Sequence, residues 1–352
     1  TELMNNPRAS VQQVYGRIME DLDEAITLLT GASARADKAE ISVEVAYGLR
    51  ARANLLMGKW AAAASDAAKA YGTSAPYSVA DVSQPTFYNA TDNAWIWGIV
   101  VTTEDYLAKT GIVNWPSNLC SLTGMGYTTA ASATDVAYRL INKNLWAKIP
   151  ETDVRKGWWV DEDLHSPVLD NGLGEDYAYY WANGMFNGGT FPSKFSPYTN
   201  VKFGPDNGTF ADTDNAQDWP LMRVEEMKLI EAEALGRDNL ATGKQKLEEF
   251  VRQYRDPSYT CTAGSLDAFI DEVWFQRRVE LWGEGFALFD ILRLKKPIIR
   301  QGANYPINST FAEIAAEAPI MIYRIPEAET SVNSAITEAD NNPAAMAPTP
   351  VN

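Results

Sequence analysis

The sequence is poor in the residues that most often perform catalysis or hold metals, with two cysteines and one histidine in 352 residues. Cys120 and Cys261 are far apart and belong to no CxxC or Cys/His cluster, so neither a zinc site nor a disulfide framework is predicted. His165 stands alone among acidic residues, which is more typical of a surface side chain than of a catalyst. The chain has no G-x-S-x-G, Gly-rich phosphate loop or H-E-x-x-H. We therefore predict that the protein is not an enzyme and needs no cofactor.

Basic residues are also scarce: 30 Lys and Arg stand against 46 Asp and Glu, which gives a net charge of −16. This charge repels phosphate backbones and no Lys/Arg-rich stretch offsets it, so nucleic acid is not expected as a partner. The run from residue 161 to 176 offers many carboxylates, but it lacks the spacing of an EF-hand. We therefore predict no metal site and keep calcium as the weaker alternative.

Long apolar runs are missing as well. No stretch of 18 or more apolar residues occurs, so no transmembrane helix is predicted, and the polar start TELMNNPRAS does not resemble a signal peptide. Hydrophobic residues make up 46% of the chain, which is ample for a globular core.

Helical periodicity is present toward both ends of the chain. Residues 11–29 place apolar side chains at helical spacing, which predicts an amphipathic helix. Residues 43–71 place small and aromatic side chains as in a tetratricopeptide-like helix pair, with the turn at Gly58. Residues 225–254 form a second candidate pair, with Gly236 between its helices. We therefore predict a mainly α-helical fold built of tetratricopeptide-like helix pairs.

The middle of the chain, residues 76–222, has a different composition. Gly, Pro, Asn, Asp, Ser and Thr increase and helical periodicity fades, apart from one predicted helix at 133–147. A segment of this length in a compact protein should contain short helices and strands of its own and is typically functional. We therefore divide the chain into a helical part at 1–75, a loop-rich insertion at 76–222 with the candidate ligand site, and a C-terminal helical part at 223–352.

The insertion holds eight of the eleven tryptophans. An aromatic ring can stack on the C–H face of a sugar while polar neighbours bond its hydroxyls, although most such rings are core anchors. Trp158 and Trp159 would point to opposite faces of a strand, so one of them should be exposed, whereas Trp95 and Trp97 would share a face. The candidate ligand-binding residues are Trp158, Trp159, Asp161, Tyr179, Tyr180, Trp181 and Asn183.

Residues 274–297 combine apolar and charged side chains in one predicted helix. Apolar residues cover much of its surface, so the helix should be buried, and buried charges persist only when they are paired. Asp290 and Arg293 are three residues apart, as are Arg277 and Glu280, so each pair can meet on one face. We predict a structural ion-pair network, formed by Arg277, Arg278, Glu280, Glu284, Asp290 and Arg293.

The same stretch carries a family resemblance. It resembles the signature helix of the SusD/RagB family of nutrient-binding outer-membrane lipoproteins at Arg278, Glu280, Leu281, Glu284, Gly285, Phe286, Asp290 and Arg293. Two further segments match in the family's order: PLMRVEEMKLIEAEAL at 220–235, and IYRIPEAE followed by NNP at 322–343. Ala287 departs from the family's pattern, because many relatives carry Arg there, so one ion pair of this helix is expected to be missing or replaced.

The resemblance implies a function. It implies non-catalytic capture of an oligosaccharide or polysaccharide at the surface of the outer membrane and delivery to a SusC-like TonB-dependent transporter. A lipid anchor would lie outside this chain, since neither cysteine has the setting of a lipidated N-terminal residue. Relatives carry a substantial portion before the helix at 11–29, so we expect that portion to be absent or the protein to be naturally short. Two alternatives stay open: peptide capture, as in relatives of the RagB type, and a tetratricopeptide-like scaffold without a small ligand.

Overall fold

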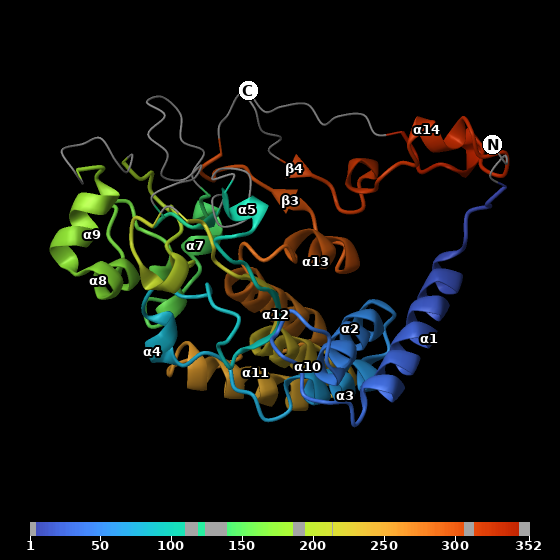
Figure 1. The fold of residues 1–352 in the computed structure, drawn as a ribbon, viewed down its shortest axis with the longest axis horizontal. Helices are drawn as coiled ribbons and strands as arrows, with labels where there is room; N and C mark the ends of the chain where they lie inside the picture. The colour runs from blue at the N-terminus through green and yellow to red at the C-terminus, as the bar shows by residue number, and fades with distance from the viewer. Residues whose placement is uncertain are drawn as a thin grey trace. The chain divides into compact units, whose positions relative to one another are not determined.

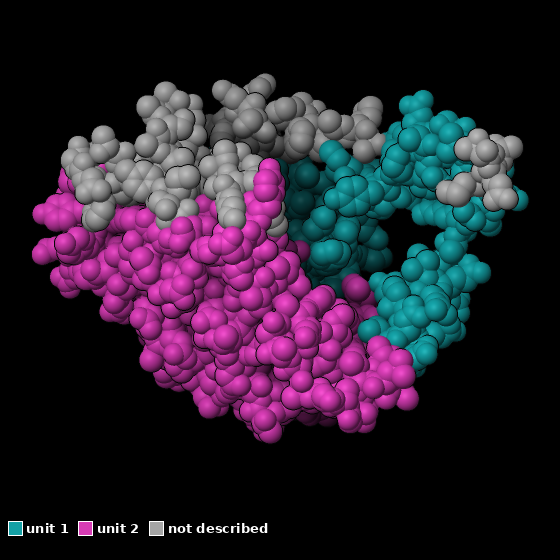
Figure 2. All heavy atoms as spheres, in the orientation of Figure 1, with its two compact units in different colours: residues 1–24, 286–352 teal, residues 25–285 magenta. Residues whose placement is uncertain are grey.

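The computed structural model describes residues 5–109, 119–123, 139–185, 194–212, 214–305 and 313–344 (Figure 1). This part of the chain is mostly helical with a few short strands, which confirms the predicted fold class. The chain forms two compact units, coloured separately in Figure 2: residues 25–285, and residues 1–24 together with 286–352. The division differs from the three parts expected from the sequence, because helices from both ends of the larger unit pack against each other.

Five helices form the frame of the larger unit. They are α2 (Val43–Leu56), α3 (Trp60–Tyr71), α10 (Val224–Asp238), α11 (Leu240–Tyr254) and α12 (Leu266–Glu280). The first pair is α2 with α3 and the second is α10 with α11, while α10 also packs against α3 and α12. Gly58 takes the left-handed φ of +70° in the turn of the first pair. Both predicted helix pairs are therefore confirmed.

Small residues let the helices of this frame approach closely. Ala63 and Ala67 of α3 are fully buried. A Cβ added at Gly243 of α11 would lie 2.3 Å from the Cα of Gly236 in α10. The prediction that Gly236 lies in the turn is wrong, because α10 continues past it. The turn falls at Asn239, whose side chain accepts a hydrogen bond from the Thr242 N–H (3.1 Å) and so begins α11.

The insertion contains short elements of its own, as predicted. They are α4 (Val79–Val82), β1 (Trp95–Ile99), α5 (Tyr106–Lys109), α7 (Lys143–Trp146), a 3₁₀ helix at Val154–Trp158, α8 (Pro167–Leu173), α9 (Glu175–Ala182), a 3₁₀ helix at Asp206–Gly208 and β2 (Trp219–Arg223). β1 and β2 pair antiparallel, with Ile99 opposite Trp219.

Two local predictions for the insertion are wrong. A register shift between Trp95 and Trp97 sends Trp95 into the aromatic core of the insertion and Trp97 against the helical frame, so the two rings do not share a face. Of the helix predicted at 133–147, residues 133–138 lie outside the described residues. Leu140 pairs with Thr199 in an extended bridge, so the helix begins only at Lys143.

The stretch 274–297 is not one helix, which corrects another prediction. α12 ends at Glu280, and α13 (Ala287–Arg293) begins after a turn. Gly283 and Gly285 have φ values of +82° and +89°, which no α-helix contains. The two glycines therefore separate the signature stretch into two helices that belong to different units.

The smaller unit is built of short segments. Besides α13 it contains β3 (Ile298–Ile299), β4 (Glu313–Ile314), a 3₁₀ helix at Pro319–Met321, α14 (Glu327–Thr330) and a 3₁₀ helix at Glu338–Asp340. β3 and β4 pair antiparallel. The Asn333 side chain accepts from the Asn6 N–H (3.2 Å) and donates to its carbonyl (2.9 Å), which ties the two ends of the chain together. The amphipathic helix predicted at 11–29 is α1 (Val11–Leu29).

Candidate functional site

A buried ion-pair network joins the helical frame to the insertion. Glu280, at the end of α12, accepts a hydrogen bond from the Arg255 Nε (2.7 Å), and guanidinium nitrogens of Arg155 and Arg223 lie 3.4 Å from its carboxylate. All four side chains are fully buried. Burial alone would raise the pKa of Glu280, but the three guanidinium groups, Arg255 foremost, hold it well below its usual range. The network therefore joins a 3₁₀ helix of the insertion and the end of β2 to the frame.

Glu280 and Glu284 of this network are among the charged residues predicted from the sequence, whereas its other carboxylates, Glu225 and Asp153, and its cations come from elsewhere in the chain. Glu284 bonds Arg223 (2.8 Å) and Lys202 (2.7 Å). Asp290 and Arg293 pair with each other in the smaller unit (2.7 Å). Arg277 and Arg278 lie in the last turn of α12, and the Arg278 guanidinium stacks over the Trp274 ring at 4.8 Å.

The three tryptophans among the candidate ligand-binding residues lie in the core of the insertion. Trp158 and Trp159 are 0% and 1% exposed, so the prediction that one of them is exposed is wrong. Trp158 ends a 3₁₀ helix and donates its indole N–H to the Val82 carbonyl (3.0 Å), while Trp159 pairs with Asn200 in a bridge. The segment is therefore not a strand with one free face. Trp181 is 1% exposed and faces the same core.

The remaining candidates lie on or near α9. Tyr179 and Tyr180 are 58% and 48% exposed, and with Tyr177 they form what we call the α9 tyrosine surface. Asn183 donates its side-chain amide to the Tyr179 carbonyl (3.0 Å) at the end of the helix. Asp161 accepts two backbone N–H groups of its own loop. Of the seven predicted residues, the two tyrosines therefore present rings to solvent, and Asp161 and Asn183 bond the backbone.

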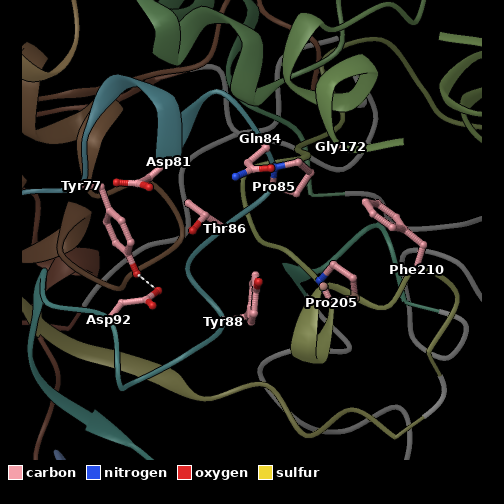
Figure 3. Close-up of a pocket in the computed structure, with 11 residues that line it drawn as sticks. Tyr77, Asp81, Gln84, Pro85, Thr86, Tyr88, Asp92, Gly172, Pro205 and Phe210 are labelled. Carbon is pink, nitrogen blue, oxygen red and sulfur yellow. Dashed lines mark hydrogen bonds between the residues drawn. The ribbon is translucent and has the colours of Figure 1, made fainter. Parts of the chain in front are cut away.

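Two adjoining pockets lie beside Tyr88 in the larger unit, and we call them the Tyr88 pockets. The first has a volume of about 290 Å³ and the second about 280 Å³. Figure 3 shows the first pocket, with the Tyr77 hydroxyl directed at the Asp92 carboxylate. Its lining combines the rings of Tyr77, Tyr88 and Phe210 with the polar side chains of Asp81, Gln84, Thr86 and Asp92. The second pocket shares Tyr88 and is lined by Asn89, Thr102, Asp206 and Asp218 among others.

Tyr88 is held in place by segments that are distant in sequence. The Asp218 N–H donates to the Tyr88 carbonyl (3.0 Å), and the Gly204 N–H donates to the Thr86 carbonyl (2.7 Å). A Cβ at Gly204 would lie 2.6 Å from the Tyr88 Cδ1, so only glycine lets the ring rest there. The preceding residue, Phe87, is fully buried with a left-handed φ of +62°. Such strain persists only where the surroundings enforce it, and it often marks functional sites.

The charged groups that line the pockets are carboxylates, which accept hydrogen bonds. Asp92 accepts the Tyr77 hydroxyl proton (2.5 Å), and burial followed by the Asp92 charge raises the pKa of Tyr77 well above its ordinary value. Burial also raises the pKa of Asp218, and burial together with the nearby Asp212 raises that of Asp206. Within the described residues the Tyr88 hydroxyl makes no hydrogen bond, and burial and then Asp92 raise its pKa. The arrangement suits ligands that donate hydrogen bonds.

Other features of the described residues bear on chemistry. His165 is on the surface, where its Nε2 lies 2.6 Å from Asp170. In the part of the chain that the structure describes, no group of three or more His, Cys, Asp or Glu side chains is arranged to hold a metal ion. No helix in that part is long and apolar enough to cross a membrane.

Tyr88 is not among the ligand-binding residues predicted from the sequence, because that prediction rests on the segments richest in tryptophan. A local signal exists: FYNATD at 87–92 joins two aromatic residues to Asn, Thr and Asp, the side chains that bond hydroxyls. The pockets themselves, however, form only where this segment meets residues 205–210 and Asp218. No pattern along the chain shows that meeting.

The sequence model of the SusD family matches residues 142–343, which is more than half of the chain. The chain belongs to the SusD family. Solved structures agree with this assignment. A SusD-like carbohydrate binding protein from Bacteroides vulgatus has a TM-score of 0.70 at 22% identity, over 97% of this chain and 68% of its own. A SusD superfamily protein from Bacteroides thetaiotaomicron has a TM-score of 0.70 at 19% identity, over 97% and 69%.

A third structure, named as a laminarin binding SusD-like protein, has a TM-score of 0.53 at 19% identity, over 95% of this chain and 69% of its own. At these identities the structures establish a shared SusD fold. No curated protein sequence matches the chain.

Proposed function

We propose that this SusD family protein captures an oligosaccharide or polysaccharide at the cell surface without cleaving it and delivers it to a SusC-like TonB-dependent outer-membrane transporter. Family membership supports the surface lipoprotein location and the transporter as partner. The ligand class is supported by two similar structures, one named as carbohydrate binding and one as laminarin binding.

The observation that carries the proposal is the position of Tyr88 between two polar pockets. An aromatic ring offers an apolar face to the C–H groups of a sugar, while side chains such as Gln84, Asp92 and Asp206 bond its hydroxyls. Two adjoining pockets that share one ring suit consecutive sugars of a chain better than one compact ligand. The Tyr88 pockets are therefore the proposed glycan site.

The α9 tyrosine surface is the rival location. Its rings are more exposed than Tyr88, and the Tyr179 and Tyr180 ring centres lie 5.9 Å apart in an edge-to-face arrangement. It lines neither Tyr88 pocket, so it is a separate location. The two locations make different predictions for mutations.

Tryptophan fluorescence can report on the first pocket, because the Trp95 indole N–H donates to the Tyr77 hydroxyl (2.6 Å) and Tyr77 lines that pocket. We expect a saturable change in emission when laminarin, mannan or glucomannan is titrated into the protein, and calorimetry of the same titrations gives the affinity. Tyr88→Ala should weaken binding by roughly tenfold or more, as for other buried aromatic contacts. Tyr179→Ala, the matched control, should leave it unchanged.

Each other outcome would change the proposed site, the proposed ligand or the proposed role. Loss in Tyr179→Ala with full binding in Tyr88→Ala would relocate the site to the α9 tyrosine surface. Saturable binding of a peptide digest, with no polysaccharide bound, would support peptide capture of the RagB type. If neither fluorescence nor calorimetry detected binding of any polysaccharide or peptide, that result would contradict the capture of a small ligand and favour a scaffold.

A further inference from the structure

The Tyr88 pockets contain negative charge without a lining cation. Their lining includes four carboxylates: Asp81, Asp92, Asp206 and Asp218. Among the described residues that line either pocket, none is Lys, Arg or His. Lys38 donates to the Asp92 backbone carbonyl (2.5 Å), yet it lines neither pocket. A ligand in these pockets therefore meets acceptor groups of one charge sign.

Protein donors contact all four of these carboxylates, and Asp206 accepts the side-chain amide of Asn207 (2.9 Å). Asp218 accepts the backbone N–H groups of Ala90 and Val101, each at 2.8 Å. Asp92 accepts the Tyr77 hydroxyl, and Asp81 accepts the Ser78 N–H (2.9 Å). A carboxylate has about four acceptor positions, so each can still accept from a ligand without moving.

Resting on the proposed function, we propose that the Tyr88 pockets select neutral glycans and glycans that bear amine groups, and exclude glycans that bear carboxylate or sulfate groups. A sugar hydroxyl can donate to a fixed carboxylate, and an ammonium group both donates and is attracted. The carboxylate group of a uronate, or a sulfate group, can only accept hydrogen bonds, and in these pockets it would face carboxylates of its own charge sign. Charges of like sign placed opposite each other across an interface are costly.

A matched set of ligands tests this selectivity. Whichever neutral polysaccharide binds in the titrations above is compared with its C6-oxidised form and its 6-amino-6-deoxy form, so that only the C6 group changes. At pH 7 and low ionic strength the oxidised form should bind roughly tenfold or more weakly than the neutral form, and the amino form at least as tightly. Added salt should shrink both differences.

A charge-neutralising variant locates the effect. Asp206→Asn keeps the shape of a pocket carboxylate and should narrow the difference between neutral and oxidised forms by about threefold, the scale of one partly exposed charge pair. Asp163→Asn is the matched control, because Asp163 is exposed and lines neither pocket. It changes the net charge equally and should leave the difference unchanged.

Equal or tighter binding of the oxidised form, or of alginate where no neutral polysaccharide binds, would overturn the selectivity and leave glycan capture intact. An equal narrowing in Asp206→Asn and Asp163→Asn would assign the effect to the overall charge of −16 and also overturn the inference. Failure of every glycan to bind would instead overturn the proposed function, and the inference with it.

Discussion

The core of the helical frame is richer in small side chains, and the core of the insertion is richer in aromatic rings. In the frame, alanines such as Ala63 and Ala67 are buried and Gly243 touches Gly236, so helices approach backbone to backbone. The core of the insertion is built of large rings, including Phe87, Phe203, Trp95, Trp158, Trp159 and Trp181. Regular helices can pack with small residues because their surfaces fit one another, whereas irregular backbone leaves wider gaps, which large rings help to fill.

The two regions also differ in what holds them. The frame is stabilised by contacts between neighbouring helices. The insertion depends on the frame, because Arg155, in the 3₁₀ helix of the insertion, and Arg223, at the end of β2, share the Glu280 carboxylate of α12. A buried carboxylate is thus the point at which the frame positions the irregular region that contains the Tyr88 pockets.

The largest effect on stability is expected from removing the Glu280 carboxylate, which the frame and the insertion share. Glu280→Gln removes the carboxylate that three buried guanidinium groups share and leaves them with one negative charge fewer, so the free energy of unfolding should fall by about 3–5 kcal/mol. Urea unfolding followed by circular dichroism measures the change. The control is Glu162→Gln, which removes an exposed pair with Lys143 (2.6 Å) and should change the midpoint little. Equal midpoints for the two variants would mean that the network does not join the regions.

A second change tests close packing in the frame. Gly→Ala inside a helix usually stabilises by up to about 1 kcal/mol. Gly243→Ala should instead destabilise by about 1–3 kcal/mol, because its Cβ would lie 2.3 Å from the Gly236 Cα and force the helices apart. The same urea titration measures it, and a stabilised variant would contradict the close approach of α10 and α11. Gly16→Ala in α1, with open space around the glycine, is the matched control.

The dependence of stability on pH sharpens the role of the network. Burial would raise the pKa of Glu284, but Arg223 and Lys202 hold it below its ordinary value of 4.5. A carboxylate with a lowered folded-state pKa contributes stability above its unfolded pKa and loses it as the pH falls through the folded-state value. Stability should therefore decline below about pH 4.5, and less steeply in Glu284→Gln. Parallel slopes in wild type and variant would contradict this assignment.

The smallest effect on stability is expected for a substitution beside the Tyr88 pockets, and its main effect should be on affinity. Gly204→Ala would place a Cβ 2.6 Å from the Tyr88 ring, so the ring should shift and affinity for the neutral polysaccharide should fall by roughly tenfold. Calorimetry of Gly204→Ala beside Gly264→Ala measures the change, because Gly264 is an exposed loop glycine with open surroundings and no positive φ. Unchanged affinity in Gly204→Ala would remove Tyr88 from the site.

The same comparison explains what the sequence could predict. The frame has local periodicity, so the helices at 43–71 and 225–254 could be read from spacing alone. The spacing predicts one helix through Gly283 and Gly285, because apolar residues on both sides continue the helical pattern. The positive φ values of these two glycines end the helix instead. Local spacing predicts an element well where no backbone conformation interrupts it.

The insertion resisted prediction because its contacts are distant in sequence. Trp158 and Trp159 are both buried, since Trp158 ends a 3₁₀ helix and Trp159 pairs with Asn200 in a bridge, and neither element has a local signature. Tyr88 is positioned by Gly204 and Asp218, more than a hundred residues later. The chemistry expected of the site, aromatic rings among polar side chains, is present in the Tyr88 pockets, but on other residues than those predicted.

The most direct test of the account is hydrogen exchange of the intact chain with and without a saturating neutral polysaccharide. Backbone groups that a ligand covers or tightens exchange more slowly. We predict slower backbone hydrogen exchange at residues 84–92 and 204–210, around Tyr88, and no change in α9. Slower exchange confined to α9, or saturable binding with no change at 84–92, would contradict the Tyr88 pockets as the glycan site.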